Sequence, residues 1–212
     1  PQQRTFYDEP VSFVTWSPER PELVFGMDEG GNERLQLHLL DDETGVVTDL
    51  TGRPEAKHRW GGWSHDGDRF AFTSNRRDEA VFDVYTQGRD ETGAEATLHH
   101  EGDGWLSVAG WSPDDDRLLV SEAYSNFDQD LYTLDLTSGD LRHLTPHEGD
   151  VRYGSPNFGP DGDALYLVTD DGHDTLYLAR LDLETLETER LVVDEDWNVD
   201  GVALDDETGR LV

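Results

Sequence analysis

The chain has 212 residues, and its 48 acidic residues outnumber its 16 basic ones to give a formal net charge of −32 at pH 7. A charge of this sign repels nucleic-acid phosphates and anionic membranes, so neither is expected as a partner. The chain has no cysteine, which excludes disulfides and thiolate-bound metals. Aromatic residues make up 10% of the chain, and this content predicts a packed core rather than disorder.

The acidic residues are spread along the whole chain, and Lys57 is its single lysine. Such a surface is tolerated where concentrated salt screens it, because the Debye length falls to about 3 Å at 1 M. The composition resembles that of proteins from salt-accumulating haloarchaea. We therefore expect folding to require molar salt and the protein to lie in a high-salt cytoplasm. The first residue is Pro1 rather than Met, which leaves export open as the alternative.

A turn motif recurs along the chain and predicts the fold. The copies begin at a large apolar anchor residue, and the fullest ones continue with Ser or Gly, then Pro and Asp, then Gly or Asp, as in 111–115 and 158–162. At 63–67 His65 replaces the proline. Proline fixes φ, aspartate bonds its own backbone, and glycine accepts positive φ, so each copy predicts a tight turn. The anchors, spaced 46 to 48 residues apart, are Trp16, Trp63, Trp111, Phe158 and, in a weaker copy, Leu204.

Each repeat is interpreted as four strands in chain order. The first strand ends at the anchor, and the second is apolar on both faces, as at 69–74 and 117–121, which is typical of a buried strand. The third strands are expected at 34–40, 83–86, 130–136 and 175–183. The outer strands are expected at 46–50, 96–99, 141–144 and 187–192. Hairpin turns are expected at 43–45, 91–93 and 137–139, and no segment keeps helical periodicity.

Four short antiparallel strands in each repeat of about 45 residues are typical of the blades of a β-propeller, so we predict an all-β fold of this kind. A sandwich of unrelated hairpins would not keep a fixed turn motif. Full blades are expected at 9–51, 52–100, 101–146 and 147–193. Residues 1–8, with a strand at 3–6, would end a preceding blade, and 194–212 would begin another. Since open strand edges are sticky, further blades are expected to close the ring.

The sequence predicts no catalytic residue, no metal site and no cofactor. A nucleophile elbow needs Gly-x-Ser-x-Gly, and the nearest approaches, at 62–66 and 110–114, lack the final glycine and coincide with the repeat turn. Aspartates cluster at 66–68 and 114–116 in the same turns, without the spaced Glu of a calcium loop. His143 and His147 have no third zinc ligand nearby in the sequence.

Propeller loops that enter the innermost strands converge on the central channel, and we looked there for binding residues. Against the acidic background, the basic and aromatic residues at these positions carry most information. An arginine beside an aromatic ring can hold a peptide carboxylate or carbonyl. The alternative is that the rings pack between blades and the arginines pair with nearby acids. The candidate substrate contacts are Arg59, Trp60, Trp105, Arg152, Tyr153 and Trp197, with Lys57, His58 and Asn198 beside them.

The Trp-Ser-Pro-Asp-Gly turn followed by an apolar strand, as at 117–121 and 69–73, resembles the TolB-type propeller repeat. In length and spacing the chain is similar to the N-terminal propeller of prolyl oligopeptidase family serine peptidases, with the acylaminoacyl- and dipeptidyl-peptidase branches nearest. Residues 6–9 and 11–27 resemble haloarchaeal members. The resemblance implies an α/β-hydrolase domain in the same parent protein, carrying the catalytic Ser, Asp and His.

The resemblance further implies that this chain is a non-catalytic domain that gates and docks peptide substrate. Its expected partners are its own hydrolase domain and the peptide. The first alternative is a stand-alone TolB-like module that binds a protein partner. The second is a self-sufficient propeller enzyme, which predicts histidines or carboxylates with perturbed pKa values around the channel.

Overall fold

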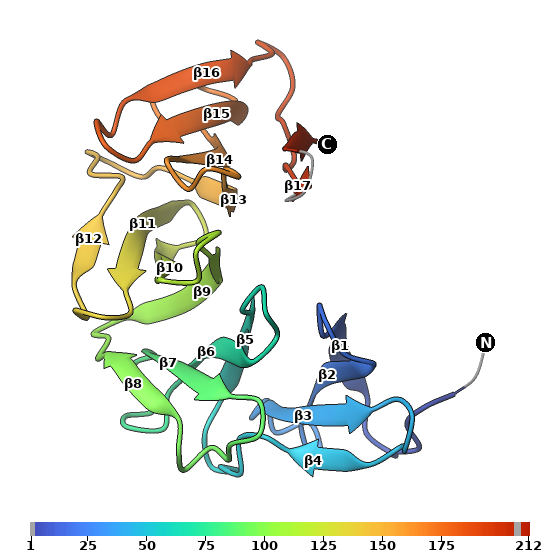
Figure 1. Cartoon of the computed structure of the whole chain (residues 1–212). Coiled ribbons are helices and arrows are strands. Elements are labelled where there is room, and N and C mark those ends of the chain that lie inside the picture. The colour runs from blue at the N-terminus through green and yellow to red at the C-terminus, as the bar shows by residue number, and fades with distance from the viewer. Residues whose placement is uncertain (1–2, 206–208) are drawn as a thin grey trace. The chain divides into compact units, whose positions relative to one another are not determined.

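The computed structural model describes residues 3–205 and 209–212. Its described residues form strands and no helix, so none of them forms a helix long and apolar enough to cross a membrane. Four antiparallel sheets contain four strands each, hydrogen-bonded in sequence order, and a two-stranded hairpin follows (Figure 1). Each four-stranded sheet corresponds to one predicted blade. The chain divides into two compact units, residues 1–103 and 104–212, and each is described by itself.

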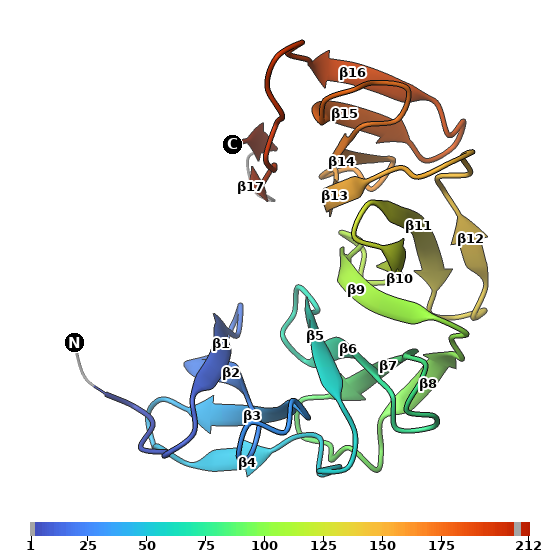
Figure 2. The same cartoon turned by 180° about the vertical axis from the view of Figure 1, so that it is seen from behind.

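The first unit contains blades 1 and 2. Blade 1 consists of β1 (Val11–Trp16), β2 (Glu22–Met27), β3 (Gln36–Asp41) and β4 (Val47–Asp49). Blade 2 consists of β5 (His58–Trp63), β6 (Arg69–Ser74), β7 (Asp83–Gly88) and β8 (Thr97–His100). Within each of these two sheets the strands are neighbours in chain order, as the view from behind shows (Figure 2).

The second unit contains blades 3 and 4 and the short hairpin. Blade 3 consists of β9 (Trp105–Trp111), β10 (Arg117–Ser125), β11 (Asp128–Asp135) and β12 (Leu141–His143). Blade 4 consists of β13 (Tyr153–Phe158), β14 (Ala164–Thr169), β15 (Tyr177–Asp182) and β16 (Thr188–Val192). The hairpin is formed by β17 (Leu204–Asp205) and β18 (Arg210–Leu211).

The strand predictions agree closely with these bounds. The first strands of the four blades end at the predicted anchors, and β6 occupies the predicted residues 69–74. The main difference is β10, which continues to Ser125 because it stays paired with β11 beyond its partner β9. Residues 3–6 form no strand. An outer strand needs the other strands of its own blade, so the preceding blade stays a prediction.

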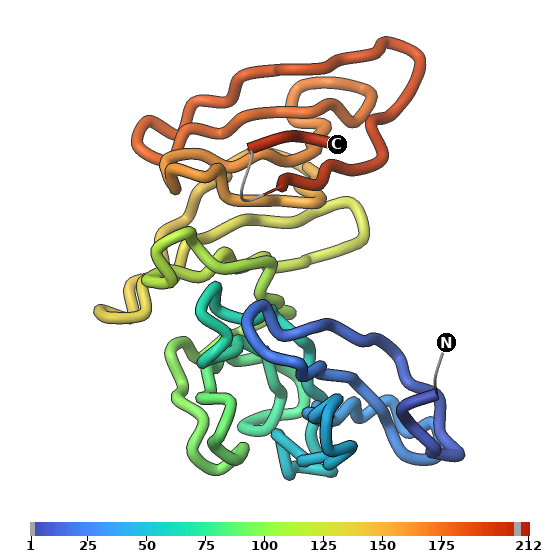
Figure 3. Tube along the Cα trace, turned by 45° about the vertical axis from the view of Figure 1, so that its right-hand side comes forward, coloured from blue at the N-terminus to red at the C-terminus, as the bar shows by residue number. Residues whose placement is uncertain are grey.

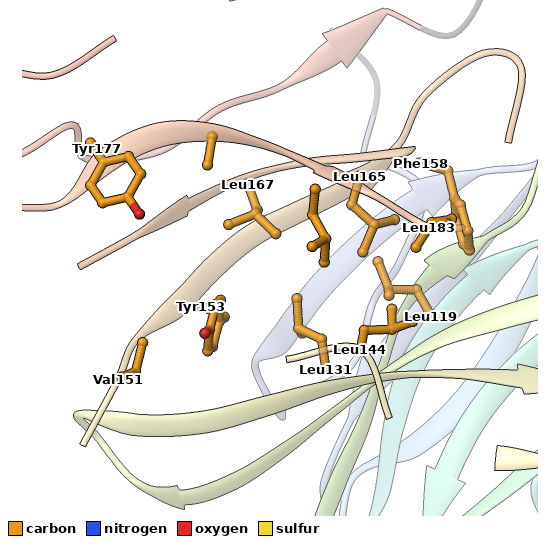
Figure 4. Packing of buried hydrophobic residues seen from close by; sticks show 12 residues of the cluster. Leu119, Leu131, Leu144, Val151, Tyr153, Phe158, Leu165, Leu167, Tyr177 and Leu183 are labelled. Atoms are coloured by element: carbon orange, nitrogen blue, oxygen red, sulfur yellow. The ribbon is translucent and has the colours of Figure 1, made fainter. Parts of the chain in front are cut away.

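The hydrophobic cores lie between neighbouring blades. In the first unit, Leu37 and Leu50 of blade 1 pack with Phe70 and Phe72 of blade 2, and all four are fully buried. In the second unit, a cluster of twelve residues joins blades 3 and 4 (Figure 4). Burying one Leu or Phe side chain contributes about 1.5–3 kcal/mol. The second strands contribute to these cores, with Val24, Phe70 and Phe72 in the first unit and Leu119, Leu165 and Leu167 in the second.

A proline of one blade also packs against a glycine of the next blade, 49 residues further on. A Cβ built on the glycine would lie 3.3–3.4 Å from the proline ring, and the glycine φ of 64° to 68° disfavours any side chain. The arginines Arg20 and Arg117 add hydrogen bonds of 3.4 and 3.2 Å to the carbonyls of two of these glycines. The pairs are Pro18 with Gly67, Pro113 with Gly162, and Pro160 with Gly209.

Candidate functional site

The serines of the repeat turn have a structural role. Ser64 Oγ donates a 2.7 Å hydrogen bond to Asp66 and accepts one of 3.0 Å from the backbone N–H of Arg69. Ser112 is held in the same way by Asp114 and Arg117. Both serines are fully buried, and their hydrogen bonds lower the pKa of Asp66 and Asp114. Both hydroxyls are therefore buried and held within the turn by a carboxylate and a backbone N–H.

The most exposed part of blade 3 is the tip of the β10–β11 hairpin. These strands have nine and eight residues, against six in β2, β3, β6 and β7, and the hairpin extends as a long loop in the yellow-green part of the trace (Figure 3). Phe127 at the tip is 62% exposed, and Tyr124 is 55% exposed. The tip therefore presents two aromatic rings to solvent on a rigid two-stranded support.

Arg152 lies beside this tip, just before β13. Its backbone N–H and its Nε both donate to Asp170, at 2.8 and 2.6 Å, so one carboxylate fixes both the backbone and the side chain. The guanidinium carbon is 5.9 Å from the centre of the Phe127 ring. Among the described residues, none pairs with the two terminal nitrogens of Arg152. This outer edge of the guanidinium can donate two parallel hydrogen bonds to a carbonyl or carboxylate.

A negatively charged cavity of about 580 Å³ lies next to Asp170. Its wall comes from the segment before β13, from the β14–β15 loop and from the segment after β16. A peptide group with a positive charge would be attracted here, and a free carboxylate would be repelled. The lining residues are Glu148, Asp150, Val151, Asp170, Asp171, Gly172, His173, Asp174 and Glu195.

Tyr153 differs from its neighbour Arg152. It begins β13 with its side chain in the core between blades 3 and 4 (Figure 4), where it is only 8% exposed. Burial raises the pKa of its hydroxyl, and the nearby Asp171 and Asp130 raise it further. Arg152 is half-buried just before the strand, whereas Tyr153 at the start of β13 points into the core and lies with the packing residues.

The candidates of the first unit lie within β5 itself rather than in the loop before it, since this strand begins at His58. Trp60 is stacked between Phe13 and Phe70, with ring centres 6.1 and 5.5 Å away. The guanidinium of Arg59 lies 4.1 Å from the centre of the Phe82 ring, and burial lowers its pKa. Trp60 therefore packs between blades 1 and 2, whereas Arg59 packs on a ring of its own blade.

The two remaining tryptophans lie in the second unit and are more exposed. Trp105 begins β9 and is 55% exposed. Trp197 is 75% exposed in the segment after β16, where its backbone N–H donates to Asp194 at 3.1 Å. In the same segment, Asn198 accepts a 2.8 Å hydrogen bond from Leu176. Sequence reasoning missed Phe127 and Asp170, although an isolated Phe within the polar turn 125–128 was an available signal.

Comparisons with known proteins agree with this fold. The chain is 28% identical over 202 residues to dipeptidyl aminopeptidase BIII of Pseudoxanthomonas mexicana, covering 92% of this chain and 28% of that protein. A solved prolyl endopeptidase superposes with a TM-score of 0.75 at 16% identity, covering 92% of this chain and 31% of its own. TolB from Acinetobacter baumannii superposes with a TM-score of 0.64 at 17% identity, and the match covers 87% of this chain and 44% of the TolB chain. No protein-family model matches.

The predicted fold class is therefore confirmed: the chain is all-β and consists of four-stranded antiparallel propeller blades. It is similar to the propellers of prolyl oligopeptidase-like peptidases and of TolB-like proteins. It spans less than a third of the curated peptidase that it matches.

Proposed function

We propose that this chain is the non-catalytic propeller domain of a serine peptidase of the prolyl oligopeptidase type, and that it gates and docks peptides for a separate hydrolase domain. The observation that carries the proposal is the match to dipeptidyl aminopeptidase BIII, which covers 92% of this chain but 28% of the relative. The turn serines support it, because they are buried and hydrogen-bonded to carboxylates. Catalysis then belongs to residues outside this chain.

Arg152 and the Phe127 tip are the proposed docking point for the peptide. The outer guanidinium edge supplies two donors for a peptide carbonyl, and the exposed ring supplies an apolar surface beside it. Asp170 holds the arginine in place before the peptide arrives. Since a pre-organised donor loses little conformational entropy on binding, this arrangement favours docking.

The first test uses a fluorophosphonate probe, which labels activated serines covalently. The complete reading frame and this chain alone are each treated with the probe. We expect labelling of the longer protein and none of this chain. Absence of labelling in both would contradict the peptidase proposal.

The second test addresses docking in the longer protein. Arg152→Ala is expected to raise KM for a peptide substrate roughly tenfold, the equivalent of about 1.4 kcal/mol, with little change in kcat. Arg142→Ala is the matched control, because Arg142 is an exposed arginine of the same unit that donates only a long hydrogen bond, 3.4 Å, to the Glu184 carbonyl. Equal effects of the two substitutions would remove Arg152 from the docking role.

The TolB match supports a second candidate, a stand-alone propeller that binds a protein partner. This candidate predicts that the reading frame ends soon after the ring closes. It also predicts that the longer protein is not labelled by the probe.

A further inference from the structure

The segment between β12 and β13 is anchored firmly at both ends and loosely in its middle. At its start, Thr145 accepts a 2.8 Å hydrogen bond from Leu131 and donates one of 3.1 Å to Asp130. At its end, the Val151 carbonyl accepts from Gln129 at 3.0 Å. Residues 146 and 148–150 between these anchors are exposed. The middle of the segment contacts the β10–β11 hairpin through His147.

The His147 side chain is only 9% exposed, yet neither of its ring nitrogens has a hydrogen-bond partner in the described part of the chain. Its Nε2 lies 3.4 Å from Oδ1 of Asp130 and 3.6 Å from Oδ1 of Asp128. These separations exceed the usual 2.7–3.2 Å of an N–H···O bond. Oδ1 of Asp128 is also buried without a hydrogen-bond partner. A buried imidazole and a buried carboxylate thus face each other without a formed bond.

The charged groups around His147 come from every element packed against it. The two aspartates lie on β11, and Asp130 is also 2.8 Å from Nε2 of His143 on β12. On β13, the Tyr153 ring centre is 5.8 Å from that of His147. Tyr124 of β10 donates to Asp130 at 3.2 Å. The surroundings are therefore rich in carboxylate, and in the described residues no group of three His, Asp or Glu side chains is arranged to hold a metal ion.

We propose that His147 is a proton-operated latch that holds the middle of the 144–152 segment against the β10–β11 hairpin. A neutral imidazole leaves a lone pair or a weakly bonded N–H facing two carboxylates. The imidazolium directs an N–H and a positive charge at both, which draws the segment inward. Protonation of the imidazole closes the latch, and loss of the proton opens it. Because the same segment ends at Arg152, the latch changes the freedom of the proposed docking point.

Hydrogen exchange of the full chain, read by mass spectrometry in EDTA at constant salt, tests the latch. Exchange rates are corrected for the intrinsic effect of pH. Protection of segments 127–131 and 144–153 is expected to fall by roughly threefold to tenfold from about pH 5.5 to about pH 7.5. Segment 164–169 of blade 4 is the internal reference and is expected to keep its protection. Unchanged protection of the latch segments in the wild type would overturn the proposal.

Variants separate the latch from general effects of pH. His147→Gln is expected to remove the pH response, whereas His143→Gln, at the neighbouring histidine on the same carboxylate, is expected to keep it. Asp128→Asn gives a second route if His147→Gln does not fold, and it is expected to reduce the response. Persistence of the full response in both His147→Gln and Asp128→Asn would overturn the proposal. So would a response that appears only when zinc replaces EDTA. These measurements do not depend on peptidase activity, so they are independent of the proposed function.

Discussion

Replacing His58 with asparagine tests how one buried imidazole couples the stability of the first unit to pH. His58 is 1% exposed. Its Nδ1 lies 3.0 Å from the Leu35 carbonyl of blade 1, and its Nε2 lies 3.2 Å from a guanidinium nitrogen of Arg76. These partners define a neutral ring that donates through Nδ1 and accepts through Nε2. Burial lowers the pKa of His58 to about 4, and the positive charge of Arg76 acts in the same direction.

The size of the change in unfolding free energy follows from the difference between this pKa and the pKa of about 6.5 that histidine has in an unfolded chain. Since the unfolded state binds the proton more readily, stability falls as pH drops through 6.5 and stops falling below about 4. At about 1.4 kcal/mol for each pKa unit, the whole window corresponds to about 3 kcal/mol. Roughly 2 kcal/mol of this is lost between about pH 7 and about pH 5.

The assay is urea unfolding followed by tryptophan fluorescence at fixed salt across this pH range. His58→Asn keeps a donor for the Leu35 carbonyl and cannot be protonated, so it is expected to be less stable at pH 7 and to lose about 2 kcal/mol less than the wild type towards pH 5. His65→Asn, at an exposed histidine of the same blade, is the control and is expected to follow the wild type. A His58→Asn curve parallel to that of the wild type would refute the reasoning.

Four other predictions concern packing, charge and the surface. Gly93→Ala would make its new Cβ clash with the Thr51 carbonyl oxygen, and it is expected to lower the unfolding free energy by about 1–3 kcal/mol or more. Gly110→Ala is the control and is expected to be tolerated, because a Cβ at that position has no atom within 4 Å. Arg89→Met leaves the buried Glu22 carboxylate without its bidentate partner and is expected to cost about 3–5 kcal/mol by urea unfolding; a loss below 1 kcal/mol would contradict the ion-pair argument. Phe127→Ser, at an exposed tip, is expected to change unfolding free energy by less than about 0.5 kcal/mol, so a larger loss would mean that the ring is packed. Dialysis from molar salt to dilute buffer is expected to unfold the chain, because its charge of −32 is then unscreened, and an unchanged circular dichroism spectrum would contradict this.

The fold could be predicted because the repeat spacing, the turn motif and the apolar second strands all indicate propeller blades. The anchors Trp16, Trp63 and Trp111 end their strands as expected, since each is followed by Ser and by one or two of the turn-forming residues proline, aspartate and glycine. Strand ends were less predictable. β10 runs on to Ser125 because of its pairing with β11, and long-range pairing of this kind leaves no local signature.

The candidate site could be predicted only in part. Arg152 was selected because basic residues are few in this acidic chain, and its docking role stays a prediction. Its neighbour Tyr153 was selected with it, and the side chain of Tyr153 lies in the core between blades 3 and 4. Asp170, which fixes Arg152, could not be singled out among 48 acidic residues. His147 was set aside for want of a third partner in the sequence, and the structure brings Asp128 and Asp130 to it from a neighbouring strand.

The contact between proline and glycine has a consequence for how such chains change in evolution. Blade 4 carries both halves of this contact: Gly162 meets Pro113 of blade 3, and Pro160 meets Gly209 of the hairpin that follows. Duplication of blade 4 would therefore place Pro160 of one copy against Gly162 of the next without any new substitution, and its deletion would leave Pro113 to meet Gly209. A deletion of part of a repeat would separate the proline from the glycine that it contacts. Recombination at blade 4 is thus expected to alter the number of blades in whole steps while the junctions on both sides of it keep their Pro–Gly contact.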